Sequence, residues 1–187
     1  MRFHPLAFLV ILGSFLCGWS LWVLFYKVEK PSVIISGVNG MNITSPSFNQ
    51  GESVPEKFTC EGKSVNPELI FREVPAGTKS IALIMNDPDV PSGTFTHWLV
   101  WNMPPQIPGI AEGTLPQGAL EGATSLGKPG YVGPCPPAGK THRYYFRVFA
   151  LDEMPMDLNT GASRMELERG MQGHVLAEGE LMGIYRR

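Results

Sequence analysis

The sequence predicts a mainly β protein: a two-sheet antiparallel β-sandwich with one or two short helices, preceded by an N-terminal transmembrane helix. Three observations support this prediction. The 187 residues include 21 Gly and 17 Pro, which favour many turns over long helices. The apolar runs after residue 40 are short and bounded by turn residues, as strands are. The exception is Leu6–Tyr26, a stretch of 21 residues without a formal charge.

The first 30 residues read as a separate unit, a membrane anchor. Its 21 uncharged residues are long enough to cross a hydrocarbon core of roughly 30 Å as a helix. The alternative is a cleaved signal peptide, but Trp19–Phe25 offers no small-residue cleavage site. We expect an anchor at 1–30, a linker at 31–40 and one domain at 41–187. The domain would be membrane-anchored and extracytoplasmic, in the periplasm or at the cell surface.

The first half of the domain reads as short strands. Strand-like segments occur at residues 41–45, 57–60 and 69–71. The apolar run 80–85 is bounded too tightly by turn signals to be a helix, so it predicts a strand buried on both faces. A second buried strand is expected at 98–102, beginning at His97.

The second half begins with residues 104–130, which are rich in Pro and Gly and show no sustained period. Such a long excursion in a compact domain is usually functional or mobile. Strands are expected at 143–151 and 175–185. Between them, a helix is predicted by the capping-box pair Ser163 and Glu166. Its inward face is expected to carry Met165, Leu167 and Met171.

Three ionisable side chains stand where a loop meets a strand. Asp87 lies in the segment DPDVPSG, and His97 lies in THWLVWNMP. His142 follows a loop rich in Pro and Gly, at the start of the strand RYYFRVFAL. We predict that these three segments form the walls of one small pocket.

One acid and two imidazoles support several chemistries. If Asp87 keeps the imidazoles of His97 and His142 protonated, the pocket is a cationic cup suited to phosphate or carboxylate. The same three side chains could instead hold iron or zinc, although they lack a familiar ligand spacing. A third alternative makes Cys135 a nucleophile with His142 as its base.

Other sequence features narrow the function classes. The formal net charge is −2, and residues 31–187 hold 12 basic against 16 acidic side chains. An acidic domain grips a nucleic acid poorly, so we expect no nucleic-acid partner. The chain lacks a P-loop, a nucleophile elbow and an HExxH motif, and we expect neither a cofactor nor a resident metal.

The cysteines leave two alternatives open. Cys17 lies in the apolar segment, which leaves Cys60 and Cys135 as an even pair in the domain. A disulfide between them would close a loop of about 75 residues, worth roughly 4 kcal/mol of loop-closure entropy. The alternative is two buried free thiols.

The segments DPDVPSG, HWLVWNMP and GYVGPCPPAGKTHRYYFRVFAL, in this order and at these separations, resemble the signatures of the phosphatidylethanolamine-binding proteins. FTCEG, NPELIF and GHVLAEGELMGIY resemble the bacterial and archaeal branch, called Raf kinase inhibitor-like proteins. The likeness covers about residues 41–187. It implies a two-sheet antiparallel β fold with a small pocket for phosphate-like anions, including phospholipid head groups.

The resemblance also implies a set of ligand-binding residues, and no catalytic ones. Carried over position by position, this set is Asp87, Asp89, His97, Pro136, His142 and Tyr144. No position matches the C-terminal pocket tyrosine of the eukaryotic relatives.

The leading hypothesis is a membrane-tethered binding protein for a small anion, phosphate or a phospholipid head group, with a role in regulating a protein partner that the sequence does not identify. The N-terminal helix would make the membrane a second partner. One alternative is a hydrolase or transferase that uses Asp87, His97 and His142 together with Cys135. Another is a protease or kinase inhibitor that acts through the surface loops at 104–130.

Overall fold

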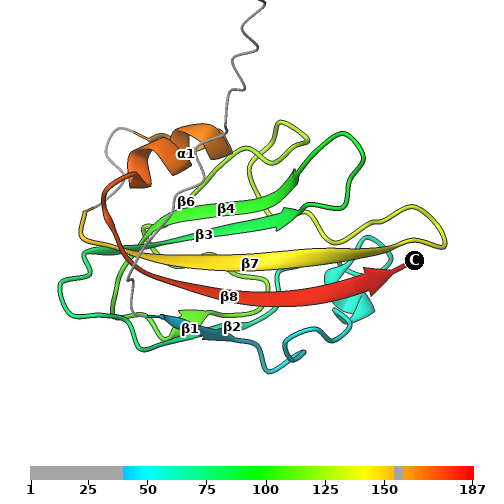
Figure 1. Cartoon of the computed structure of the whole chain (residues 1–187), viewed down its shortest axis with the longest axis horizontal. Coiled ribbons are helices and arrows are strands. Elements are labelled where there is room, and N and C mark those ends of the chain that lie inside the picture. Colours follow the sequence, from blue (N-terminus) through cyan, green and yellow to red (C-terminus); the bar gives the residue numbers. More distant parts are fainter. Residues whose placement is uncertain (1–39, 154–157) are drawn as a thin grey trace, which may run out of the picture. The chain divides into compact units, whose positions relative to one another are not determined.

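The computed structural model describes residues 40–153 and 158–187, which lie within one compact unit, Val33–Arg187. In chain order the elements are β1 (Asn42–Thr44), the 3-10 helix η1 (Glu56–Phe58), β2 (Leu69–Arg72), β3 (Ser80–Asp87), β4 (Phe95–Met103), β5 (Gly109–Ile110), β6 (Leu120–Glu121), β7 (Thr141–Leu151), α1 (Arg164–Met171) and β8 (Val175–Arg186) (Figure 1).

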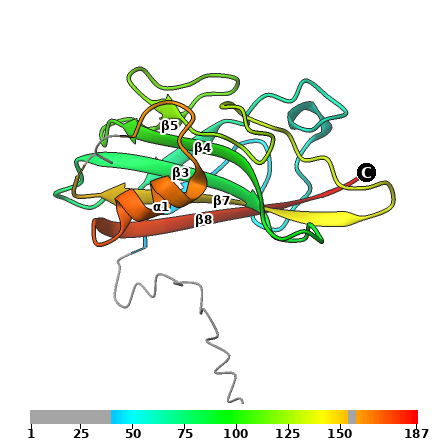
Figure 2. The same ribbon diagram turned by 90° about the horizontal axis from the view of Figure 1, so that it is seen from above.

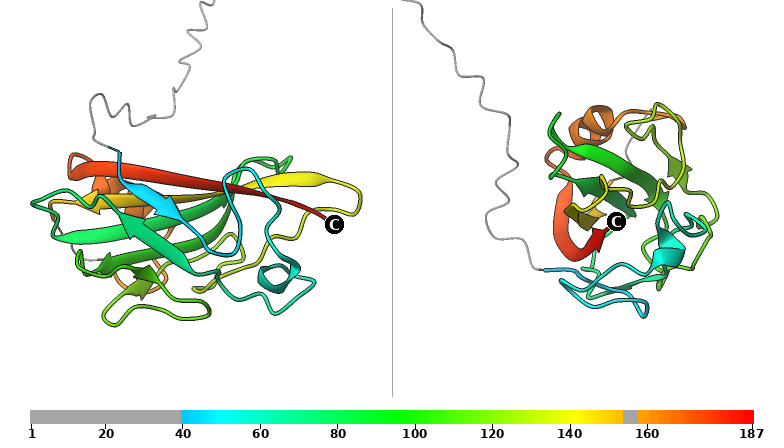
Figure 3. Two further views of the ribbon diagram at one scale, coloured as in Figure 1. Left: turned by 90° about the horizontal axis from the view of Figure 1, so that it is seen from below. Right: turned by 90° about the vertical axis from the view of Figure 1, so that its right-hand side faces the viewer.

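The strands form two antiparallel sheets. The small sheet has the order β1-β2-β5, and the large sheet has the order β6-β4-β3-β7-β8. In the left view of Figure 3, β1 and β2 lie in front of the large sheet. β3 occupies the centre of the large sheet, with β4 and β7 paired antiparallel on either side. All eight residues of β3 are buried, as expected of a strand that is covered on both faces.

The large sheet is covered on each face by a separate apolar cluster. The larger cluster fills the space between the sheets, where alternate residues of β3 such as Ile81, Leu83 and Met85 meet Phe71 of β2. The smaller cluster lies under α1, where Leu167 and its neighbours pack on the outer face of the sheet (Figure 2). Site residues at the end of β3 therefore rest on a support packed from two sides.

The two-sheet antiparallel β fold is confirmed, but two local predictions are wrong. Residues 57–60 form part of a 3-10 turn instead of a strand, because Thr59 donates from both its N–H and its hydroxyl to the Glu56 carbonyl. The predicted capping box of Ser163 and Glu166 does begin α1. Met165, however, is 65% exposed. It stands two residues from Leu167, which rotates it to the opposite side of the helix.

The prediction that the fold includes an N-terminal transmembrane helix is not supported. Within residues 40–153 and 158–187, no helix is long and apolar enough to cross a membrane. The two helices of this part have three and eight residues, whereas a spanning helix needs about 20. The segment on which the anchor was predicted, residues 1–30, lies outside the described residues.

Candidate functional site

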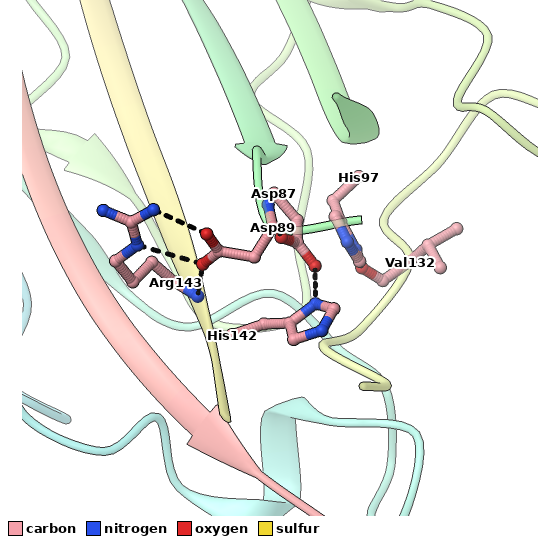
Figure 4. Close-up of polar contacts among 6 residues, drawn as sticks. All are labelled: Asp87, Asp89, His97, Val132, His142 and Arg143. Atoms are coloured by element: carbon pink, nitrogen blue, oxygen red, sulfur yellow. Dashed lines mark hydrogen bonds and ion pairs between the residues drawn. The ribbon is translucent and has the colours of Figure 1, made fainter. Parts of the chain in front are cut away.

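The strand order brings the three predicted junctions together. Asp87 is the last residue of β3, while His97 and His142 lie near the starts of β4 and β7. Because both neighbours run antiparallel to β3, their starts lie beside its end. All three side chains are buried. Figure 4 shows the His142 ring below the Asp87 carboxylate and the His97 ring to its right.

Asp87 and His142 form a buried pair. His142 Nδ1 lies 2.7 Å from Asp87 Oδ2, and the two side chains are 8% and 3% exposed. A carboxylate only accepts hydrogen bonds, so Nδ1 carries the proton and donates it. The other carboxylate oxygen accepts from the Asp89 N–H at 2.8 Å. Both oxygens of Asp87 therefore have protein partners, and Nε2 of His142 remains for a ligand.

His97 occupies a β-bulge. Met85 pairs with Trp98 and the next residue, Asn86, pairs with Thr96, so His97 is the extra residue of β4. Bulges occur next to functional sites because they re-aim a side chain. The ring of His97 reaches the loop before β7, where its Nδ1 donates to the Val132 carbonyl at 2.7 Å. In return, the Val132 N–H donates to the His97 carbonyl at 3.0 Å.

The surroundings of His97 favour an uncharged ring. Its ring centroid lies 4.6 Å from that of Phe95 and 5.2 Å from that of Tyr144. Burial lowers the pKa of His97 below its usual value of 6.5, and the hydrogen bond to Val132 and the charge of Asp87 offset this only in part. The expectation that both imidazoles are protonated therefore does not hold for His97 near neutral pH.

Asp89 is directed away from the imidazoles. Its carboxylate accepts from the N–H and Nε of Arg143, both at 2.9 Å, and from Nη2 at 2.5 Å (Figure 4). These contacts lower the pKa of Asp89, with the side-chain hydrogen bond from Arg143 as the largest cause. Of the predicted ligand-binding residues, Asp89 thus supports the rim and does not line the space between His97 and His142.

Tyr144 lies on the same face of β7 as His142, two residues further along the strand. Its side chain is fully buried, and its hydroxyl has no hydrogen-bond partner among the described residues. Burial is the largest cause that raises the pKa of this hydroxyl, and the negative charge of Asp87 adds to it. A buried hydroxyl beside the pair is a polar group that a ligand could satisfy.

Pro136 is buried in the loop before β7, next to the exposed Cys135. The structure joins Cys135 to Cys60 in a disulfide across 75 residues of sequence. A sulfur in a disulfide is not a free thiolate, so Cys135 is no nucleophile in this state.

One residue that lies next to the site is not identified by the sequence analysis. Tyr185 of β8 pairs across the ladder with His142, and it is buried. Its hydroxyl donates to Glu61 Oε2 at 2.5 Å. Alternation along residues 175–186 could have placed Tyr185 on the inner face together with Ala177 and Leu181. The pairing partner of that strand, however, cannot be read from its own residues.

The arrangement can act as a hydrogen-bonding dyad or an acid–base pair. A carboxylate that holds an imidazole through Nδ1 leaves Nε2 to donate or accept a proton. No group of three or more His, Cys, Asp or Glu side chains suited to holding a metal occurs in the described part of the chain. Two surface hollows, of about 390 and 180 Å³, are lined by other residues.

Comparisons with known proteins agree with this fold. Residues 44–186 match the family described as phosphatidylethanolamine-binding protein. A UPF0098 protein of Methanothermobacter thermautotrophicus is 45% identical over an alignment of 152 residues that covers 79% of this chain and 99% of that protein. UPF0098 protein PH1269 of Pyrococcus horikoshii is 43% identical over an alignment of 190 residues that covers 97% of this chain and 87% of that protein.

Two solved structures are similar as well. A putative phosphatidylethanolamine-binding protein homolog, CT736 of Chlamydia trachomatis, superposes with a TM-score of 0.75 at 40% identity, covering 80% of this chain and 99% of that chain. YbcL of E. coli, described as a new member of the mammalian family, has the same TM-score and coverage at 29% identity. The resemblance read from the signature segments is confirmed: the chain belongs to the phosphatidylethanolamine-binding protein family.

Proposed function

We propose that the protein is a binding protein whose site at Asp87, His97 and His142 takes a small phosphate-like anion. The observation that carries the proposal is the buried Asp87–His142 pair at the meeting point of three strands. The carboxylate fixes one ring nitrogen of His142 and balances the positive charge that the ring gains when its second nitrogen is protonated. A protonated Nε2 is a strong donor to an anionic oxygen.

The neighbouring groups complete the proposed site. The neutral ring of His97 leaves its own Nε2 free, because its Nδ1 donates to Val132. In the neutral ring that Nε2 is an acceptor, so it suits the hydroxyl of a protonated phosphate group. The Tyr144 hydroxyl offers a further donor. A monoanionic phosphate, which carries both acceptor oxygens and hydroxyls, matches this combination better than a fully ionised one does.

This proposal makes anion binding depend on pH. Binding strengthens as the pH falls because the monoanionic form of phosphate, which keeps the hydroxyls that the neutral His97 ring accepts, becomes more abundant. The test is isothermal titration with inorganic phosphate and with phosphoethanolamine at several pH values, with ethanolamine as the control that lacks phosphate. Affinity for both phosphates should rise toward acidic pH, and ethanolamine should not bind.

A matched pair of variants assigns the effect to the site. His142→Ala should weaken phosphate binding by about 10- to 100-fold, as expected for the loss of a hydrogen bond to a charged group. His174→Ala removes a partly exposed imidazole that pairs with Asp152 instead, and it should leave the affinity unchanged. Equal binding by the His142→Ala variant and the unchanged protein would refute the proposal.

The enzymatic alternative gains no support from the geometry. Its nucleophile, Cys135, is bonded to Cys60. The remaining pair of His142 and Asp87 could still act as an acid–base dyad, and turnover of a chromogenic phosphoester that disappears in His142→Ala would favour that reading.

A further inference from the structure

The disulfide between Cys60 and Cys135 connects the proposed site to a distant part of the chain. Residues 131–136, here called the latch loop, form one wall of the site through the Val132 carbonyl that holds His97. Residues 56–64, here called the anchor segment, surround η1 and lie more than 60 residues earlier in the sequence. The disulfide is the covalent bond between the two.

Three hydrogen bonds join the same two segments. The Tyr131 hydroxyl donates to the Phe58 carbonyl at 3.0 Å, and the Gly133 N–H donates to Ser64 Oγ at 3.0 Å. The Cys60 N–H donates to the Pro134 carbonyl at 3.1 Å. The backbones touch at Gly133, where an added Cβ would lie 2.7 Å from the Phe58 carbonyl oxygen. The latch loop is thus held by the anchor segment, in addition to the two hydrogen bonds between its Val132 and His97 of β4.

The two sulfurs have unlike surroundings. Arg187 Nη1 lies 3.6 Å from Cys135 Sγ. Cys60 is followed by Glu61, whose carboxylate lies 3.8 Å from Arg187 Nε and also accepts from Tyr185. A cation beside Cys135 stabilises a thiolate there, whereas an adjacent carboxylate disfavours one at Cys60. Both cysteine residues are exposed, so a thiol can reach the bond.

We propose that the Cys60–Cys135 disulfide is a thiol-exchange site, and that its reduction by a dithiol releases the latch loop and weakens anion binding. The second half of this inference rests on the proposed function. A thiolate of the dithiol attacks Cys60 Sγ, the S–S bond breaks, and Cys135 leaves as a thiolate beside Arg187. In the mixed disulfide, one sulfur of the dithiol is bonded to Cys60 Sγ, and the second thiol of the same dithiol then attacks that sulfur. Cys60 leaves as a thiolate. The dithiol is thereby oxidised to a disulfide, and the Cys60–Cys135 disulfide is reduced by two electrons to two free thiols.

The consequence follows from what the latch loop holds. Without the covalent bond, the loop keeps its three hydrogen bonds to the anchor segment and the two between Val132 and His97. Opening of the loop then withdraws the Val132 carbonyl from His97 and frees the His97 ring within its bulge. Because the strands themselves are tied by their own ladders, we expect the change to stay local.

The experiment compares the full chain before and after treatment with dithiothreitol, and adds the variant Cys60→Ser/Cys135→Ser as a permanently unbonded form. Hydrogen exchange at the Val132 and Gly133 amides should accelerate about tenfold or more on reduction, while the β7 amide of Phe146 stays protected. Phosphate affinity should fall in parallel. The rate of reduction should drop several-fold in Arg187→Gln and not in the neighbouring control Arg186→Gln.

Each of the other outcomes of this experiment refutes a particular part of the proposal. A bond that dithiothreitol cannot reduce under native conditions refutes the exchange site. Unchanged hydrogen exchange at the Val132 and Gly133 amides refutes a local latch. Accelerated hydrogen exchange throughout β7 also refutes it, because the disulfide would then stabilise the whole fold. Equal phosphate affinity of the oxidised and reduced forms refutes the coupling. Absence of phosphate binding in the oxidised protein refutes the proposed function instead, and the exchange measurement then decides the latch by itself.

Discussion

The buried Asp87–His142 pair allows a quantitative prediction of its free energy of interaction. The atoms lie 2.7 Å apart, and the side chains are almost inaccessible to water, at 3% and 8% exposure. Removing one partner from such a pair leaves an unpaired polar group in the interior. We expect Asp87→Ala and His142→Ala each to lower the free energy of unfolding by about 3–5 kcal/mol at neutral pH, the usual cost of breaking a buried pair.

A double-mutant cycle separates the interaction from the loss of packing. The coupling energy between Asp87 and His142 should be about 1.5–3 kcal/mol, as for a hydrogen bond to a charged group. The matched control is Arg147–Glu180, which has a similar distance of 2.8 Å but is 41% and 36% exposed. Its coupling should not exceed about 1 kcal/mol. Urea-induced unfolding measures all variants, and equal couplings for the two pairs would refute the reasoning.

Three further predictions test other parts of the account. Tyr144→Phe should raise the stability of the unliganded protein by about 1–3 kcal/mol, because it removes a buried hydroxyl without a partner, yet weaken phosphate binding; a loss of stability in thermal unfolding would contradict this. The pKa of His97 is lowered on folding, so the unfolded ring binds more protons as the pH falls below 6.5. The free energy of unfolding should therefore decline below this pH by up to about 1.4 kcal/mol per pH unit, and the decline should be absent in His97→Gln. Urea-induced unfolding at several pH values measures both proteins, and an equal pH dependence of the two would contradict this prediction. Gly133→Ala should cost about 1–3 kcal/mol, since its Cβ would lie 2.7 Å from the Phe58 carbonyl oxygen, whereas Gly40→Ala, which meets nothing within 4 Å, should be neutral.

Much of the fold was accessible from local patterns. The runs at 80–85 and 98–102 were identified as buried strands because turn residues bounded them closely, and both lie within central strands of the large sheet. Turn-bounded apolar runs report burial on two faces without any knowledge of the partner strand. The capping box at Ser163 is equally local, since both of its hydrogen bonds lie within one helical turn.

The features of the site that local patterns do not predict depend on distant segments. The bulge at His97 arises from the register between β4 and β3, which no local pattern encodes. The lowered pKa of His97 follows from its burial, with Phe95 on one side of the ring and Tyr144 on another. Tyr185 is placed beside His142 by the pairing of β7 with β8. Charge state and ligand geometry are therefore set by tertiary contacts, even where the residues themselves can be picked out in advance.

The most direct test of the anion site is NMR observation of the imidazole nitrogens while inorganic phosphate is added at mildly acidic pH. The account predicts that the Nε2 resonances of His142 and His97 shift with a common saturation curve, while those of His174 stay in place. Saturable phosphate binding that leaves both buried rings unperturbed would contradict it, since the anion would then lie elsewhere on the protein.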